Sequence, residues 1–300
     1  MERKRSQLRK CLEEPVEYGT TWFEFVKFVH CPLPEFSLEK IDTTAEFLGK
    51  KFPYPLMASP LTGGIPESKE INRVIAEACS QLGIPMCLGS QRVALLVGGD
   101  VESFSIAREV SEDLFLVANI GMSDLVKDPS LAEKAVEMVD ANALAIHVNP
   151  LQESLQEGGS PSFENALQVL EEVCEGLKVP VIVREVGCGM PWEIAYELSR
   201  RGVGAIDVGG FGGTNWAIVE AGEGSPFREW GIPTAASILE AEKARKMRQE
   251  KPEELPFYVV ASGGIRSGLD VAKAVRLGAD MAGVGLPILK AAKKLSLIHI

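Results

Sequence analysis

Eight short apolar segments recur along the chain, and each is followed by a longer stretch with the spacing of an amphipathic helix. The short segments are rich in Val, Ile, Leu and Ala, which is typical of parallel strands buried on both faces. The longer stretches have the length of crossover helices. The predicted strands cover residues 55–61, 85–89, 114–121, 143–149, 180–187, 204–210, 257–264 and 281–285.

This alternation predicts an α/β fold of the TIM (β/α)8 barrel type, with one barrel domain over residues 55–294. Residues 1–54 mix helical and extended patterns, and we expect this N-terminal extension to pack on the barrel end. The segment TNWAIVEAGEGSPFREWG (214–231) lengthens the connection between the sixth and seventh strands, so we expect a lid or rim loop there. Asp128 with Pro129, and Ser267 with Gly268, have the residue types that open helices.

Little sequence follows the eighth predicted strand. Only LPILKAAKKLSLIHI (286–300) remains, so we expect the eighth helix to be missing or incomplete. The ending LSLIHI is also what a widely used sequencing-adapter sequence would encode if read through. We therefore expect residues 295–300 to be a non-native tail.

Charge and cysteine usage narrow the class of protein. Thirty-one basic and 42 acidic side chains give a net charge of −11, which argues against a nucleic-acid partner. No apolar run is long enough for a membrane span, and the charged start leads into no export signal. Six scattered cysteines without a CxxC pair are typical of a reducing compartment, so we expect a cytoplasmic protein.

Glycines cluster where the last two predicted strands end. ASGGIRSG (261–268) follows the seventh strand and enters a helix, and GVGLP (283–287) ends the eighth. Barrels of this type commonly hold phosphate after these two strands, because glycines let backbone N–H groups approach the oxygens. Arg266 adds a charge. The pattern predicts a phosphate-bearing cofactor, although Gly263 and Gly264 alone would also suit a tight turn.

The fourth strand ends in HVNPLQE (147–153). Period-two alternation directs His147 and Asn149 to the same, inward side, where polar groups need hydrogen-bond partners or a function. A pair of hydrogen-bonded core residues is the alternative interpretation. Glu153 is the candidate Mg²⁺ ligand, because Mg²⁺ is usually held by a lone carboxylate together with substrate phosphates.

Other strand ends carry residues suited to a ring-shaped cofactor and an anionic ligand. Glycine pairs suit a flat ring against the backbone, Asn119 and Thr214 suit hydrogen bonds, and Arg92 and Arg184 suit anions. Glu185 and Asp207 lie within predicted strands, where a general base and a residue that orients a neighbour are equally good interpretations.

Taken in order, HVNPLQE, REVGCG, GGTNW and SGGIRSG, together with TGG and GSQR, resemble the type 2 isopentenyl diphosphate isomerases. The resemblance runs from Arg3 to about Lys294. It implies interconversion of isopentenyl and dimethylallyl diphosphate with reduced FMN and Mg²⁺, NADPH as reductant, and a homo-oligomer, tetrameric or octameric. An electron-rich reduced flavin would stabilise the tertiary carbocation formed when an alkene is protonated.

The resemblance also implies roles for individual residues. Gln152 would be the catalytic relay, and Glu153 would hold Mg²⁺ on the diphosphate. Residues implied to bind the substrate are Arg3, Lys4, Ser90, Gln91, Arg92, His147, Asn149 and Gln152. Residues implied to bind FMN are Pro60, Leu61, Thr62, Ser90, Asn119, Arg184, Thr214, Gly264, Ile265, Arg266, Gly285 and Leu286.

Three positions depart from the family pattern. Arg184 stands where the family normally has a lysine facing the flavin N1 edge, Gln7 replaces a histidine, and Leu61 replaces a methionine.

Three other functions remain open on the sequence. A hydroxy-acid oxidase would place histidine and arginine near the strand-six or strand-seven glycines, and GGFGGTNW has neither. An inosine monophosphate type of dehydrogenase would want a cysteine in the strand-six loop, whereas Cys188 follows strand five. The third alternative is a flavin or diphosphate binder without catalytic activity.

Overall fold

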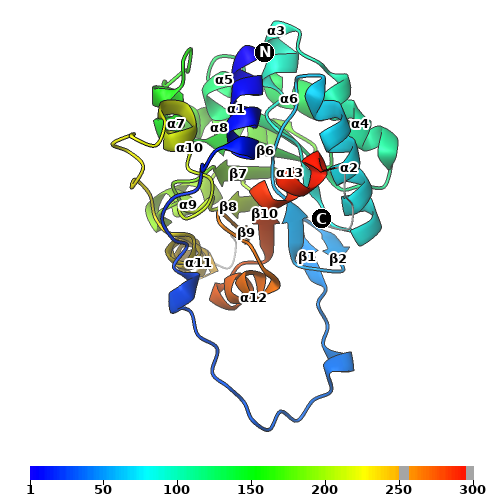
Figure 1. The fold of residues 1–300 in the computed structure, drawn as a ribbon, viewed down its shortest axis with the longest axis vertical. Helices are drawn as coiled ribbons and strands as arrows, with labels where there is room; N and C mark the ends of the chain where they lie inside the picture. The colour runs from blue at the N-terminus through cyan, green and yellow to red at the C-terminus, as the bar shows by residue number, and fades with distance from the viewer. Residues whose placement is uncertain (250–256, 295–300) are drawn as a thin grey trace.

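The computed structural model describes residues 1–249 and 257–294 of the chain. Eight parallel strands close into a barrel in the order β10-β3-β4-β5-β6-β7-β8-β9 (Figure 1). The predicted α/β barrel is therefore confirmed, and each of the eight predicted strands contains one barrel strand. The strands are β3 (Leu56–Ala58), β4 (Met86–Cys87), β5 (Leu116–Gly121), β6 (Ala143–Val148), β7 (Val181–Glu185), β8 (Ala205–Asp207), β9 (Tyr258–Ser262) and β10 (Met281–Val284).

Helices surround the barrel and cover its rim (Figure 1). No helix of the described chain is long and apolar enough to cross a membrane. The helices after β3 are α2 (Glu67–Leu82), α3 (Arg92–Val97), α4 (Glu102–Val110), α5 (Met122–Leu125), α6 (Leu131–Glu137), α7 (Pro150–Leu155), α8 (Ala166–Gly176), α9 (Trp192–Ser199), α10 (Trp216–Ala221), α11 (Thr234–Gln249), α12 (Gly268–Leu277) and α13 (Leu286–Lys293).

Local sequence signals explain where helices begin. Ser267 opens α12 as predicted, since its side chain accepts from the Asp270 backbone N–H while Asp270 bonds back in a capping box. The prediction at Asp128 and Pro129 was wrong by two residues, because α6 begins at Leu131. Asp128 instead accepts hydrogen bonds from the backbone and hydroxyl of Ser130 in the turn before the helix.

The first 54 residues reach both ends of the barrel. A hairpin of β1 (Ala45–Phe47) and β2 (Lys50–Phe52) lies at the amino end of the barrel strands, where Phe47 and Phe52 join a buried cluster with Met57 and Met281. Helix α1 (Glu2–Glu13) lies at the opposite end and contacts α10 and α13 (Figure 1). Two short 3₁₀ turns, η1 (Phe23–Phe25) and η2 (Leu38–Lys40), lie between α1 and β1.

The insertion after β8 forms α10 and a loop that leads to α11, so it is a helix and loop at the rim. After β10, α13 packs against α2 and α1. The helix α13, eight residues long, follows the eighth strand, so the expectation that no helix follows it is wrong. The predicted non-native tail, residues 295–300, lies outside the described residues.

Candidate functional site

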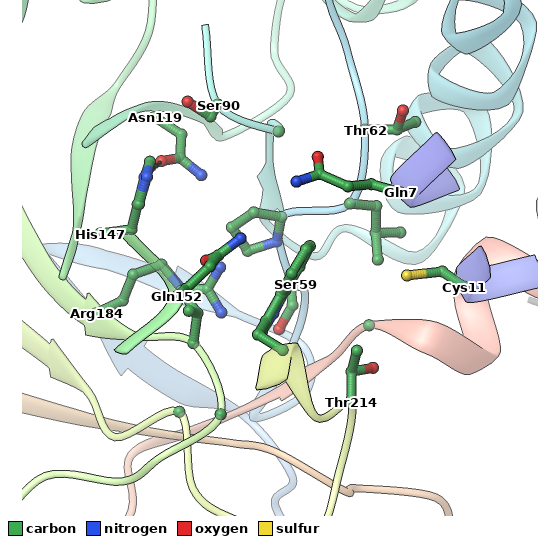
Figure 2. Close-up of a pocket in the computed structure, with 18 of the residues that line it drawn as sticks. Gln7, Cys11, Ser59, Thr62, Ser90, Asn119, His147, Gln152, Arg184 and Thr214 are labelled. Atoms are coloured by element: carbon green, nitrogen blue, oxygen red, sulfur yellow. Dashed lines mark hydrogen bonds between the residues drawn. The ribbon is translucent and has the colours of Figure 1, made fainter. Parts of the chain in front are cut away.

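A large pocket opens at the carboxyl end of the barrel, and the ends of all eight strands line it together with one face of α1 (Figure 2). This is the end at which barrel enzymes place their sites. Predicted residues that line it are Arg3, Lys4, Pro60, Leu61, Thr62, Ser90, Arg92, Asn119, His147, Gln152, Glu153, Arg184, Thr214, Gly264, Ile265, Arg266, Gly285 and Leu286.

The glycine-rich side of the pocket offers backbone donors. Within the described residues, no hydrogen bond engages the backbone N–H groups of Gly264, Ile265, Gly285 and Leu286. Gly285 caps the N-terminus of α13 without any side-chain hydrogen bond. Free N–H groups at a helix N-terminus are suited to binding a phosphate group.

We call the four residues with free N–H groups (Gly264, Ile265, Gly285 and Leu286) the glycine cradle. Close packing of the neighbouring loops fixes its shape. A Cβ on Gly213 would lie 2.4 Å from the backbone N of Gly264, and one on Gly263 would lie 2.1 Å from the carbonyl O of Gly210. The loops after β8 and β9 therefore touch through bare backbone. At the outer edge, Arg266 forms an ion pair with Glu17.

The floor of the pocket is a polar layer. The Ser59 Oγ is buried and has no hydrogen-bond partner among the described residues. It occupies space that a side chain on Gly283 would need, because a Cβ there would lie 2.5 Å away. Nearby, the Arg184 Nε donates to Asp207 Oδ2 at 3.2 Å, and the Ser262 hydroxyl donates to Asp207 Oδ1 at 2.5 Å. An orphaned buried hydroxyl and a glycine-lined cradle suit a flat polar ring with a phosphate, so these residues fit FMN.

His147 is neutral in this site. Burial, followed by the charges of Arg184 and Lys4, lowers the pKa of His147 to about 3. Its Nδ1 lies 2.9 Å from Asn119 Oδ1, and the Asn119 amide nitrogen donates to the Leu88 carbonyl. Because Asn119 Oδ1 can only accept, Nδ1 carries the proton and Nε2 is an acceptor. Figure 2 shows Asn119 and Arg184 on either side of His147.

A group of three cations lies at the start of α1, and two of them belong to its first turn. Arg3, Lys4 and Arg92 line this part of the pocket. Burial and the charges of Arg3 and Arg92 lower the pKa of Lys4 to about 8. Arg92 forms an ion pair with Asp124 at 3.2 Å, and burial raises the pKa of Asp124. Asp124 was not predicted as a site residue, because nothing in its pattern distinguishes it from an ordinary helix residue.

Glu153 is the predicted metal ligand, and its side chain is buried at the pocket wall. Its Oε2 accepts from the Ser160 backbone N–H at 2.7 Å, which leaves Oε1 available. No group of three or more His, Cys, Asp or Glu side chains in the described chain forms a metal site. The residues therefore fit a cation held by one carboxylate and by ligand oxygens.

Gln152 projects into the pocket from the first turn of α7 (Figure 2). Its amide nitrogen lies 3.1 Å from Glu220 Oε1, which also accepts from the Gln7 amide at 2.8 Å. Glu220, which lies on α10 in the rim insertion, was not predicted as a site residue. The three side chains link α7, α10 and α1.

Two predicted substrate-binding residues lie outside the pocket lining. The Gln91 side chain is fully buried, donates to the Ala135 carbonyl and accepts from the Asn119 backbone N–H. Asn149 caps α7 by accepting from the Gln152 backbone N–H at 2.6 Å. Both side chains shape residues of the pocket without lining it.

Glu185 also supports the site from outside its lining. Its carboxylate accepts from the backbone N–H groups of Gly187 and Cys188. Burial raises the pKa of Glu185 to about 7, and these N–H bonds partly offset that rise. The geometry favours an orienting role over a general base for Glu185. The same holds for Asp207, because its two oxygens are already engaged.

Comparison with known families places the chain among flavoproteins. The FMN-dependent dehydrogenase family matches residues 94–295. Similar proteins include the isopentenyl-diphosphate delta-isomerase of Archaeoglobus fulgidus, 45% identical over 97% of this chain and 84% of the relative. The enzyme of the same name from Methanothermobacter thermautotrophicus is 45% identical over 97% of this chain and 81% of its own.

Solved structures share the fold. A flavocytochrome b2 variant superposes with a TM-score of 0.69 at 19% identity, covering 98% of this chain and 74% of that one. A mandelate oxidase variant gives 0.59 at 18% identity, covering 100% and 80%. At such identities the likeness concerns the fold alone.

Proposed function

The chain belongs to the FMN-dependent isopentenyl-diphosphate delta-isomerases, and from this premise we propose how its own residues interconvert isopentenyl and dimethylallyl diphosphate. The observation that carries the proposal is one pocket with three parts. The three parts are the glycine cradle of free backbone N–H groups, a cationic end with the buried carboxylate of Glu153, and the amide of Gln152 between them.

We propose that FMN occupies the polar floor and the glycine cradle. Its phosphate would be held by the free N–H groups of Gly264, Ile265, Gly285 and Leu286, which have no acceptor in the described protein. When bound and reduced, FMN supplies an electron-rich ring that exchanges a proton with the alkene and stabilises positive charge beside it.

The diphosphate would bind at the cationic end. Arg3, Lys4 and Arg92 offer charge-assisted hydrogen bonds there. We propose that Mg²⁺ joins the diphosphate to Glu153, whose second oxygen is free of hydrogen bonds in the described protein. Because α1 covers this end, the bound substrate would be shielded from water, which protects a carbocation from hydration.

The Gln152 amide is the candidate relay for the second proton. Glu220 holds the amide nitrogen and also holds Gln7 on α1. A carboxylate hydrogen-bonded to an amide that faces the substrate can orient it and accept a proton through it or through water. We therefore propose that Gln152 acts on the isoprene and that Glu220 positions it.

Three further properties are proposals. NADPH would reduce the flavin. A homo-oligomer, tetrameric or octameric, would cover the segment between η1 and β1, where Val29, Leu33 and Leu38 are 96%, 80% and 80% exposed. A cytoplasmic location is supported by six cysteines that are all free. Light scattering on the purified protein tests the assembly.

A direct assay tests the function. The purified chain is supplied with FMN, NADPH and Mg²⁺, and isopentenyl diphosphate is followed by product chromatography. The expected result is formation of dimethylallyl diphosphate with no net consumption of NADPH. Gln152→Ala should keep its flavin and lose turnover. Omitting Mg²⁺ should weaken substrate binding, and a Glu153→Gln variant should no longer respond to added Mg²⁺.

A hydroxy-acid dehydrogenase is disfavoured by one observation. The ends of β8 and β9, residues 207–216 and 262–268, contain no histidine, so a base that abstracts a hydroxy-acid proton is missing there. Flavin that is reduced by a hydroxy acid would contradict the isomerase proposal.

A further inference from the structure

The buried contact between Arg184 and Asp207 has no assigned role in the reaction. The two residues are register partners on β7 and β8, at the same height in the barrel. Their side chains are 10% and 5% exposed, and Nε lies 3.2 Å from Oδ2. Arg184 lines the pocket, whereas Asp207 lies behind it.

Asp207 is itself held from two directions. Its Oδ1 accepts from the Ser262 hydroxyl at 2.5 Å and from the Gly209 backbone N–H at 3.3 Å. The carboxylate therefore joins β7, β8 and β9 at one level. A carboxylate held in this way has a fixed position, and so it fixes whatever it binds.

Arg184 uses only one of its nitrogens in this contact. Its Nε donates to Asp207, and the two terminal nitrogens have no hydrogen-bond acceptor elsewhere in the described protein. The guanidinium is always charged, and its remaining donors border the pocket. Because Asp207 holds the guanidinium through Nε, the guanidinium has one orientation and its two terminal nitrogens stay free to donate.

We propose that Asp207 is a positioning residue for the flavin: it fixes Arg184 through Nε and sets the net charge that the pocket floor presents to FMN. The proposal rests on the FMN site proposed above. With both charges present, the floor is close to neutral. Without the Asp207 charge, the Arg184 cation is uncompensated at low dielectric and favours the more negative, reduced flavin.

The midpoint potential of bound FMN measures this charge directly, without reference to isomerase activity. Asp207→Asn in the FMN-loaded protein should raise the midpoint potential by about 30 mV or more. For a two-electron couple, that shift is a tenfold change in the equilibrium between oxidised and reduced flavin. Arg184→Met should lower it. The double variant, which has neither charge, should return close to the parent value.

A fourth variant covers failure of Asp207→Asn to fold. Ser262→Ala keeps both charges and removes one hydrogen bond that partly offsets the Asp207 charge, so it should shift the potential downward by less than tenfold. Residues with only a structural role would give no such opposed shifts.

An Asp207→Asn protein that binds FMN at an unchanged or lower potential overturns the proposal, as does an unchanged potential in Ser262→Ala. A chain that takes up no FMN overturns it together with the FMN site. A chain that binds FMN but does not isomerise would refute the proposed function alone.

Discussion

The glycine cradle makes a quantitative prediction at Gly213. A Cβ there would lie 2.4 Å from the Gly264 backbone N, whereas unstrained non-bonded contacts lie at roughly 3.5 Å. Gly213→Ala must therefore separate the loops after β8 and β9 by about 1 Å. The Gly213 backbone has no left-handed φ, so the substitution acts through its contacts with the backbone of Gly263 and Gly264.

In the proposed FMN site, a displacement of that size would break a hydrogen bond from the cradle to the phosphate. A bond near 2.9 Å that lengthens by about 1 Å no longer counts as one. Hydrogen bonds to charged groups contribute about 1.5–3 kcal/mol, so losing one should weaken FMN binding by about 10- to 150-fold. Flavin fluorescence titration of the apoprotein measures this change.

Two controls separate the cradle from a general loss of stability. Gly268 lies in ASGGIRSG, the motif that contains Gly264, and a Cβ on it meets nothing within 4 Å, so the FMN affinity of Gly268→Ala should stay within about twofold of the parent. Riboflavin lacks the phosphate, so its affinity should be nearly equal in the parent and Gly213→Ala. Unchanged FMN affinity in Gly213→Ala, or an equal loss for riboflavin, would refute the reasoning.

Three further predictions follow from the site. Arg184→Lys should retain FMN and keep or raise turnover, since it preserves the positive charge, and a complete loss in the isomerisation assay would mean that the site requires the guanidinium. Lys4 has a pKa of about 8, so affinity for inorganic pyrophosphate should fall as pH rises through 8, whereas calorimetry on Lys4→Arg should show a flatter profile. Burial raises the pKa of Glu185 from 4.5 to about 7, so the folded protein keeps a proton that the unfolded chain releases, and the unfolding free energy should fall by about 3 kcal/mol between pH 4.5 and 7. Urea titrations should show that Glu185→Gln removes this part of the pH dependence, and an unchanged difference between the two pH values would contradict it.

The barrel was predictable because its signals are local. Each strand is a short run made up mostly of apolar residues, as in LFLVANIG over β5, because a parallel strand of the barrel is covered on both faces. The glycine-lined loop after β9 was predictable for the same reason, since ASGGIRSG contains both the glycines and the start of α12 in one run of eight residues.

Side-chain direction past the strand ends was not predictable in this way. Period-two alternation holds only within a strand, and Asn149 lies one residue beyond β6, where it caps α7. Gln91 lies in the loop after β4, and its side chain turns into the core between Ala135 and Asn119. The direction of such a side chain depends on which nearby backbone groups lack a hydrogen-bond partner, and that is set by the three-dimensional fold.

Contacts between distant elements were also beyond the sequence. Glu220 looks like an ordinary helix carboxylate until α10 brings it to Gln152. The face of α1 that carries Lys4, Gln7 and Cys11 has helical spacing, but nothing in that spacing says that it lies over a pocket.

Helix α1 also links the assembly of the pocket to the order of synthesis. It contacts α13, so the roof of the pocket joins the first helix of the chain to the last described one. During synthesis α1 emerges long before its two partners, α10 and α13, and α13 follows the last strand of the barrel. Loop closure over so many residues is slow, so we expect the roof to dock late in folding. A ligand held beneath it would stabilise the docked helix and so slow the first step of unfolding.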